Sequence, residues 1–446
     1  MKVAYFTPLN PKRSGISDYN EELIFYLKDY LDIHLFLDGY SPSNISVLNN
    51  FLIFDIKDFE SQHARYNYQV CIYHVGNNQQ YHEYLYRHAL EYSGIIVMHD
   101  YALHHMLAGM LLENKSSDYL EEVYYNYGEA GLNLARKALS GVIPPLWETS
   151  AIDYPMNRRI IESSKGIIVH SAYVQDIISK TKPDIPTRVV TMHCADIVDN
   201  PIDEKIQARK RLGINSQEII LASFGLIVAT KRIDIILRVI KKLSKYFSDF
   251  RYYLVGQEVE EFRIRDLVKE LGLKDKVVFT GHIALDKFKD YMKASDVCLN
   301  LRYPDQGETS ASLIRLMGMG KPVFVSNVGS FVEVPSDVVI KINVNETEEN
   351  DLFDELVKYL NNPYLINEIG SKALDYVRNN CSFKKSALNY YEFIDEVVKS
   401  QGSLESLIGH KICTEISETL AEIGITREKD KFIYEVACLL DDIGMG

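Results

Sequence analysis

The stretch DQGETSASLIRLMGMGKPVFVSNVGSF, from Asp305 to Phe331, carries the most specific structural signal in this sequence. It places Gly-Glu-Thr-Ser before an apolar segment with helical periodicity, then follows the helix with Gly-Met-Gly-Lys-Pro and a short apolar strand. The first amides of such a helix, at Thr309, Ser310 and Ala311, have no partners within the helix. With the helix dipole, these amides predict an anion-binding site.

The residues beside this helix start indicate what is attached to the anion. Glu308 would repel a phosphate, so we expect it to accept hydrogen bonds from the hydroxyl groups of an attached sugar. Gly307 would let the backbone approach a ligand closely. An ordinary capped helix, with Ser or Thr as the cap and Glu favourable to the dipole, explains these residues equally well from local chemistry.

Length and composition predict a two-domain globular protein. The chain has 446 residues, 46% of them hydrophobic and 25% charged, which is typical of soluble domains. Its formal net charge of -13 argues against nucleic acid and against a polybasic membrane surface as partners. The 6 cysteines form no Cys-x-x-Cys pair and are expected to be reduced core residues of a cytoplasmic chain. Without an apolar run of about 18 residues, no stable membrane insertion is expected.

Short apolar strand candidates alternate with amphipathic helical stretches along most of the chain. The candidates are KVAYFTPL, IHLFLDGY, QVCIYHVG, GIIVMHD, GIIVHS and RVVTMH in the first half, and EIILASFG, YYLVG, KVVFTG, VCLNL, PVFVSN and VVIKI in the second. This alternation predicts an α/β fold with two doubly wound, Rossmann-like parallel-sheet domains facing a cleft. The predicted domains are residues 1–198, with a helical insertion near 106–162, and residues 199–384.

Ligands of open parallel sheets bind outside the carboxyl ends of the strands, so polar groups that directly follow strands are candidate site residues. Lys231 and Arg232 follow the strand that ends at Gly225 and precede a helix. Cations oppose the dipole at a helix start, so this pair indicates a bound anion such as a diphosphate. A solvated surface pair is the alternative.

Two further groups of polar residues follow strands of the first domain. His99 and Asp100 end a buried strand, and we expect His99 to contact the reacting centre or carry a proton there. A structural histidine is the alternative, and a metal site is disfavoured because no ligands at matching spacing complete a set. Asn77, Asn78 and His82 suit a hydroxyl-rich ligand because they offer donors and acceptors without net charge, although an ordinary Asn-Asn turn fits equally well.

Several motifs resemble those of a known enzyme family in their order and spacing. They are SGISDY after the first strand, GNNQQYH, VMHDYALHH, VHSAY, FG…K from Phe224 to Lys231, FTGHI, and GETSASLIRLMGMGKPVFVSNVGSFVEVP. Together they resemble the retaining glycosyltransferases of the GT-B fold, in the large family-four group and its GETS subgroup, over nearly residues 1–400. No G-x-G-x-x-G follows the first strand, and neither a G-x-x-x-x-G-K-[ST] loop nor an Asp-x-Asp triplet occurs.

The resemblance implies that the second domain binds a UDP-, GDP- or dTDP-linked sugar and that the first binds a glycan or protein acceptor. It implies a transfer that needs no metal and no cofactor and keeps the anomeric configuration. The implied donor site comprises Gly15, Gly225, Lys231, Arg232, Gly256, Gly281, His282, Ile283, Gly307, Glu308, Thr309, Ser310, Ser312 and Leu313. The expected catalytic residues are His99, Asp100, Lys231 and Glu308, and the expected acceptor residues are Asn77, Asn78 and His82.

Two positions depart from the pattern of the larger family. The larger family has a Glu-x7-Glu motif over this helix. In this chain Arg315 stands at the position of the second Glu, so we assign no ribose contact to this residue. The arginine that often follows the strand before Lys231 is replaced by Leu226, and we expect Arg232 to substitute for it. A non-catalytic partner subunit and a nucleotide-sugar epimerase remain alternatives, although the GETS motif argues against the epimerase.

The end of the chain extends beyond the part that resembles the family. The resemblance implies that residues 385–400 form a helix that crosses back to the first domain. Residues 401–446 have helical periodicity and are predicted to be an appended helical extension, suited to self-association or to docking of a partner.

Overall fold

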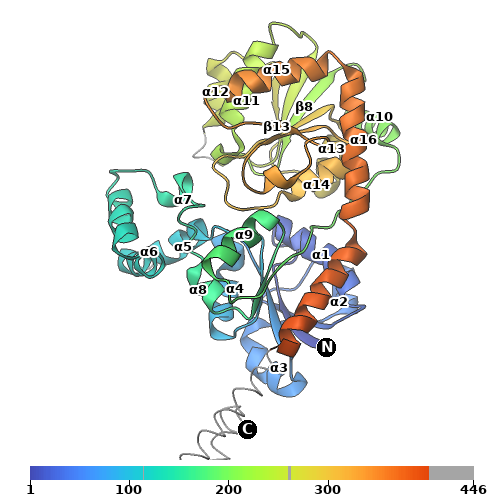
Figure 1. The fold of residues 1–446 in the computed structure, drawn as a ribbon. Helices are drawn as coiled ribbons and strands as arrows, with labels where there is room; N and C mark the ends of the chain where they lie inside the picture. The colour runs from blue at the N-terminus through green and yellow to red at the C-terminus, as the bar shows by residue number, and fades with distance from the viewer. Residues whose placement is uncertain (114, 260–262, 401–446) are drawn as a thin grey trace, which may run out of the picture. The chain divides into compact units, whose positions relative to one another are not determined.

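The computed structural model describes residues 1–113, 115–259 and 263–400. Its first domain, coloured blue to green in Figure 1, contains a parallel sheet. The strand order of this sheet is β3-β2-β1-β4-β5-β6-β7. The strands are β1 (Lys2–Phe6), β2 (Asp32–Leu37), β3 (Leu52–Asp55), β4 (Val70–Val75), β5 (Ile95–Met98), β6 (Gly166–Val169) and β7 (Thr187–Val189). The order reverses between β1 and β4, which places the loops after these two strands at a topological switch point.

The second domain contains a parallel sheet with the order β10-β9-β8-β11-β12-β13. The strands are β8 (Ile219–Phe224), β9 (Phe250–Val255), β10 (Val277–Phe279), β11 (Val297–Asn300), β12 (Val323–Ser326) and β13 (Ile340–Ile342). Both faces of this sheet are buried. Leu221 of β8 belongs to one apolar cluster, whereas its neighbours Ile220 and Ala222 belong to another, as the twofold alternation of a strand requires.

Helices cover both sheets. The first domain has α1 (Gly15–Leu27), α2 (Ile45–Asn50), α3 (Phe59–Tyr66), α4 (Gln79–Glu91), α5 (His104–Leu112), α6 (Ser116–Leu139), α7 (Leu146–Thr149), α8 (Arg158–Glu162) and α9 (Ala172–Thr181). The second has α10 (Pro201–Leu212), α11 (Ile233–Leu243), α12 (Ile264–Glu270), α13 (Leu285–Ala294), α14 (Ala311–Gly318), α15 (Glu348–Leu360) and α16 (Pro363–Asn380). Short 3-10 turns are η1 (Ile56–Asp58), η2 (Ala229–Lys231) and η3 (Gly329–Glu333). Residues 383–400 are also helical.

The stretch from Asp305 to Phe331 folds as a loop, helix α14, strand β12 and the start of η3. Lys321 of its Gly-Met-Gly-Lys-Pro segment is buried and donates from Nζ to the carbonyl oxygens of Lys293 and Ser295, the latter at 3.1 Å. These carbonyls lie at the end of α13, where backbone oxygens have no partners within the helix. Lys321 therefore caps the end of α13, and its role in this segment is to hold that helix against β12.

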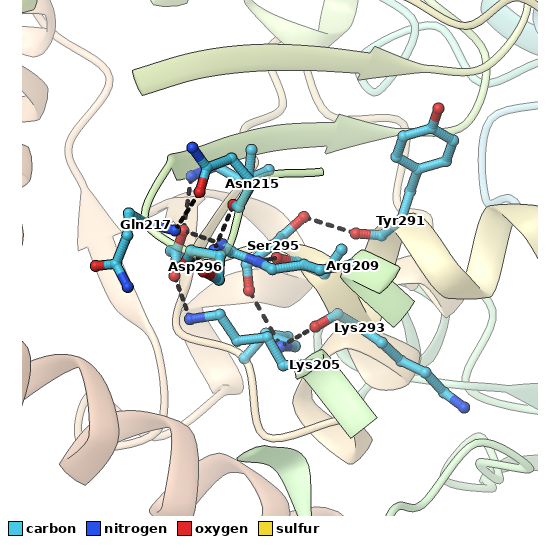
Figure 2. A network of polar contacts seen from close by, with 12 residues as sticks. Lys205, Arg209, Asn215, Gln217, Tyr291, Lys293, Ser295 and Asp296 are labelled. Atoms are coloured by element: carbon cyan, nitrogen blue, oxygen red, sulfur yellow. Dashed lines mark hydrogen bonds and ion pairs between the residues drawn. The ribbon is translucent and has the colours of Figure 1, made fainter. Parts of the chain in front are cut away.

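A network of polar contacts fixes α10 to the start of β11 (Figure 2). The carboxylate of Asp296 accepts hydrogen bonds from Arg209 Nη2 and from the amide of Ile220, each at 2.6 Å, and also pairs with Lys205. Arg209 is buried and uses its remaining donors on backbone oxygens, including Ala294 O at 3.0 Å. The network therefore joins a helix, a loop and two strands around one carboxylate.

The predicted fold class is confirmed, since two parallel α/β sheets are present and all six strands predicted in the second half exist. The first sheet has one more strand than predicted, because β3 was missed. No helix in the described ranges is long and apolar enough to cross a membrane. The predicted extension at 401–446 lies outside the described residues.

Candidate functional site

Loops that follow strands of both sheets surround a cavity of about 730 Å³, which we call the strand-end cavity. Its lining residues are Asn10, Arg13, Ser14, Gly15, Asp18, Asn78, Gln80, Tyr81, Gly225, Leu226, Gly256, Gln257, His282, Ile283, Ala284, Leu285 and Phe288. The loops after β1, β4, β8, β9 and β10 all contribute. Of the predicted site residues, it brings together Gly15, Asn78, Gly225, Gly256, His282 and Ile283.

Lys231 lies directly behind the cavity wall. Its Nζ donates to Phe224 O at 2.5 Å and lies 2.8 Å from the position that a Cβ on Gly225 would occupy. The residue is only 7% exposed. Burial, reinforced by the charge of Arg302 and opposed by that of Glu308, holds the pKa of Lys231 well below its usual range. A desolvated amine at this place is suited to an anionic ligand.

Arg232 does not join Lys231. It has a left-handed backbone conformation, with φ of 57°, and its guanidinium binds the carboxylate of Glu348, with Nε 3.1 Å from Oε1. Because Glu348 is only 3% exposed, this pair is a structural contact between the start of α11 and α15. The assignment of Arg232 to the donor diphosphate stays a prediction, which this pairing does not favour.

The cation that does act on Lys231 is Arg302, which the sequence analysis missed. It lies two residues beyond β11, and its Nε is 3.2 Å from Oε1 of Glu308. The second carboxylate oxygen of Glu308 accepts the amide of Gln306 at 2.8 Å. Burial lowers the pKa of Arg302, although the charge of Glu308 opposes this shift. Its position directly after a strand was the available signal, the same one that singled out Lys231.

Helix α14 has a side-chain cap. Ser310 is the N-cap residue, and its Oγ accepts the amide of Leu313 at 3.2 Å and the Nδ2 group of Asn300 at 3.1 Å. Leu313 is buried and its amide is bound to Ser310 Oγ, and its predicted contact with the donor stays a prediction. Ser312 lies against the cap, with Oγ 3.0 Å from that of Ser310. In the described part of the chain, no acceptor binds the amides of Ala311 and Ser312, which remain available to an anion.

Gly307 lies where the loop before α14 packs against the first domain. Its φ is 72°, and a Cβ at this position would lie 2.4 Å from Cβ of Tyr101 and 3.3 Å from Cγ2 of Val174. The glycine is therefore required by packing against the first domain, where the amide of Ala102 also donates to Gln306 O at 3.0 Å. Its expected contact with a ligand stays a prediction. Gly281, by contrast, has open space where its Cβ would be.

His99 and Asp100 follow β5 as predicted. His99 Nε2 lies 2.9 Å from Nδ1 of His74, and burial holds its pKa well below the usual range, so the imidazole is neutral. Asp100 Oδ2 accepts the amide of Asn77 at 2.7 Å. Burial, reinforced by the charge of Glu308, raises the pKa of Asp100 to about 6. The charge of Glu308 thus acts on Lys231 and Asp100 together.

Two of the three predicted acceptor residues are occupied elsewhere. The Asn77 side chain accepts the amide of Met106 at 2.9 Å and faces Gln306 Oε1 at 3.4 Å. His82 is 1% exposed, and its Nδ1 lies 3.2 Å from His74 O. These contacts favour structural roles for Asn77 and His82, whose acceptor role stays a prediction. Of the three residues, Asn78 alone is among those that line the cavity. Over the described ranges, no three His, Cys, Asp or Glu residues are arranged to hold a metal ion.

Arg315, in the second place of the motif, pairs with two carboxylates. Its Nη2 is 2.8 Å from Oε1 of Glu22 on α1, and its Nη1 binds Asp196. Asp196 also pairs with Lys289 at 2.7 Å. The residue therefore connects α14 with the first domain and with the segment before α10.

Comparison with known proteins agrees with this architecture. Residues 204–376 match the model of the family Glycosyl transferases group 1. The chain is 26% identical over 211 residues to N-acetyl-alpha-D-glucosaminyl L-malate synthase of Bacillus anthracis, covering 45% of this chain and 54% of that protein. The alignments span 27% to 63% of the length of the curated relatives that it matches.

Solved structures with the same fold cover most of the chain. Sucrose-phosphate synthase from Thermosynechococcus elongatus aligns with a TM-score of 0.63 at 15% identity, over 90% of this chain and 100% of that one. Anabaena HepE in complex with UDP-glucose aligns with a TM-score of 0.58 at 13% identity, over 90% and 100%. At such low identity these matches establish the two-domain GT-B fold alone.

Proposed function

We propose that this protein transfers a sugar from a nucleotide-sugar donor to a hydroxyl group of a glycan or protein acceptor, retaining the anomeric configuration and without a metal ion. One observation carries the proposal. The buried amine of Lys231 lies against Gly225 in the wall of a cavity to which strand ends of both sheets contribute, and the charge of Glu308 acts on it. An amine and a carboxylate whose charges interact suit a diphosphate joined to a sugar.

In the proposed reaction, the acceptor oxygen bonds to the anomeric carbon on the face from which the diphosphate departs. The bond between that carbon and the phosphate oxygen breaks, and this oxygen takes the proton of the acceptor hydroxyl. The protein needs no nucleophile of its own and acts by positioning and charge stabilisation. Lys231 and the free amides of α14 stabilise the departing diphosphate, and Glu308 accepts hydrogen bonds from the sugar.

The first domain contributes neutral polar groups. His99 is an uncharged imidazole, so it contacts a sugar hydroxyl without competing for the diphosphate. Asp100 is linked to Glu308 through their charges and holds the amide of Asn77. UDP-sugars are the first donors to test, because one structural neighbour was solved with UDP-glucose.

The test is acceptor-free donor hydrolysis with UDP-, GDP- and dTDP-linked sugars, in the presence and absence of EDTA. We expect slow release of one nucleotide, unaffected by EDTA and lost in Lys231→Ala and Glu308→Ala. Lys358→Ala, which removes an exposed ion pair on α15, is the matched control and retains the wild-type rate. No release from any donor, with no nucleotide binding by thermal shift, would favour a non-catalytic partner subunit.

A further inference from the structure

Arg302 and Glu308 form an ion pair in which most of each side chain is removed from water. The two side chains are 13% and 19% exposed. The backbone of Arg302 is fixed because its amide donates to Ser326 Oγ at 2.9 Å, and the carbonyl of Glu308 accepts from Ser330 Oγ at 2.6 Å. Both residues are therefore held in place from β12 and η3, while one edge of each side chain stays accessible.

Each oxygen of Glu308 already has a partner in this state. Oε1 faces Arg302, and Oε2 accepts the amide of Gln306. Each oxygen keeps a lone pair for a further hydrogen bond, but the two contacts fix the orientation of the carboxylate, so it can turn towards a sugar only by giving one of them up. The contact to Arg302 is the one that an incoming ligand can replace, because Gln306 belongs to the same short loop as Glu308.

The charges around this pair leave room for one more anion. Lys231 and Arg302 repel each other through a mostly buried region, and Lys231 Nζ donates to a backbone carbonyl. Glu308 balances one of the two cations when Lys231 is protonated. A buried cation without a counter-charge is costly, so a ligand that brings negative charge to this place is favoured.

We propose that the diphosphate of the donor displaces Glu308 from Arg302, and that this exchange frees the carboxylate to accept hydrogen bonds from the sugar. The inference rests on the proposed function and adds a residue and an order of events to it. Arg302 is the second cation of the diphosphate site, in place of Arg232. A neutral sugar binds poorly on its own, because Glu308 can reorient towards it only after an anion has occupied Arg302.

The exchange predicts that removal of the Glu308 charge strengthens nucleotide binding. Glu308→Gln removes the competitor for Arg302, so this variant binds UDP more tightly than the wild type, by roughly tenfold, because a charge-assisted bond no longer has to be broken. The gain is much smaller for UMP, which lacks the second phosphate. Calorimetric titration of the wild type and of Glu308→Gln with UDP and with UMP measures the gain in affinity for each nucleotide. If the wild type prefers another base, GDP and GMP or dTDP and dTMP take the place of UDP and UMP.

Simple repulsion between Glu308 and phosphate would also strengthen binding in Glu308→Gln, so Arg302 has to be removed in parallel. Arg302→Gln is expected to bind UDP at least about tenfold more weakly. The double variant Arg302→Gln/Glu308→Gln, which leaves no unpaired charge behind, is expected to gain less than about twofold over Arg302→Gln. Arg251→Gln, which breaks the Arg251–Glu218 pair at 2.9 Å on β9, is the matched control and keeps wild-type affinity.

Each outcome has a defined meaning. An equal gain from Glu308→Gln with and without Arg302 would show repulsion alone and overturn the exchange. Unchanged preference of the double variant for UDP over UMP would remove Arg302 from the diphosphate site. A wild type that binds no nucleotide, while thermal unfolding shows it to be folded, would instead overturn the proposed function.

Discussion

Burial and charge act together on a single amino group at Lys231. The residue follows β8, donates to Phe224 O, and has a pKa held well below its usual range by burial and by Arg302. An anion placed beside it would favour the protonated form and raise this pKa again. The same residue therefore connects ligand binding with proton uptake.

Binding of a nucleoside diphosphate is accordingly expected to take up a proton and to weaken as the pH rises. Above the pKa of the free enzyme's Lys231, affinity falls up to tenfold per pH unit until the pKa of the complex is reached. Calorimetric titrations with UDP in two buffers of different ionisation enthalpy measure the number of protons taken up. They are done at pH 8, which is well above the Asp100 pKa of about 6, so that Asp100 does not contribute. Lys231→Arg, which stays charged, should abolish it; uptake that persists in this variant would assign the proton to another group.

Gly225 and Gly281 separate steric from backbone effects near the same cavity. Both have positive φ, at 85° and 65°, so alanine costs each a similar strain of roughly 1–2 kcal/mol. Only at Gly225 would the new Cβ meet Lys231 Nζ, at 2.8 Å, whereas Gly281 has open space. We expect Gly225→Ala to weaken UDP binding several-fold more than Gly281→Ala, at similar melting temperatures. Equal effects of the two substitutions would mean that the position of Nζ is unimportant.

At the residue scale, the sequence predicted which loops after strands carry the charged site residues, but not which of those residues form ion pairs. Lys231, Glu308 and Asp100 were predicted, and the structure brings their charges together. The ion pair of Arg232 was not predicted, because its partner Glu348 lies 116 residues away in sequence. Arg302 was missed although it follows a strand, because a single cation in a polar loop adds no further local pattern to that signal. Side-chain pairing depends on tertiary contacts, which a single sequence does not display.

At the scale of elements, periodicity predicted nearly all strands because buried parallel strands are continuous apolar runs. The exception, β3, reads LIFD and is an edge strand with partly exposed residues, so its signal resembles that of a turn. Helix α14 illustrates the limit at element ends. Its apolar pattern located the helix, but the cap geometry of Ser310 decided which amides stay free.

The Asp296 network predicts a difference between two aspartates of the second domain (Figure 2). Asp296→Asn leaves Arg209, 5% exposed, without its carboxylate, which is expected to cost about 3 kcal/mol of unfolding free energy. Asp290→Asn breaks the pair with Arg211, which is 49% exposed, and is expected to cost at most about 1 kcal/mol. Urea denaturation measures both. Similar midpoints for the two variants would show that the network does not hold α10 to the sheet.

At the scale of the whole molecule, the chain passes between its two sheets twice, and these passages touch. The amide of Cys194 donates to Cys381 O at 3.0 Å, and Ser386 Oγ donates to Thr191 O at 2.8 Å. Phe383 stacks on Tyr26 of α1, with ring centroids 4.6 Å apart. The start of the helix at 383–400 is thus attached to the first domain, beside the segment that leaves it.

Charged contacts add to these connections. Glu333 of η3 accepts the amides of Ala172 and Tyr173 at the start of α9, the first at 3.0 Å, where the helix dipole favours a carboxylate. On the other side, Arg315 pairs with Glu22 of α1. Each contact joins a loop or helix of the second domain to a helix of the first. Together they predict that the two domains unfold as one cooperative unit.

The last prediction tests this coupling. In Arg315→Gln/Glu333→Gln both contacts are lost, and we expect the single calorimetric transition of the wild type to separate into two, because each domain has its own core. Glu355→Gln, which removes an exposed pair on α15, is the control and keeps one transition. One transition in the double variant, merely shifted to lower temperature, would place the coupling in the two chain passages instead. Two transitions in the wild type would contradict cooperative unfolding altogether.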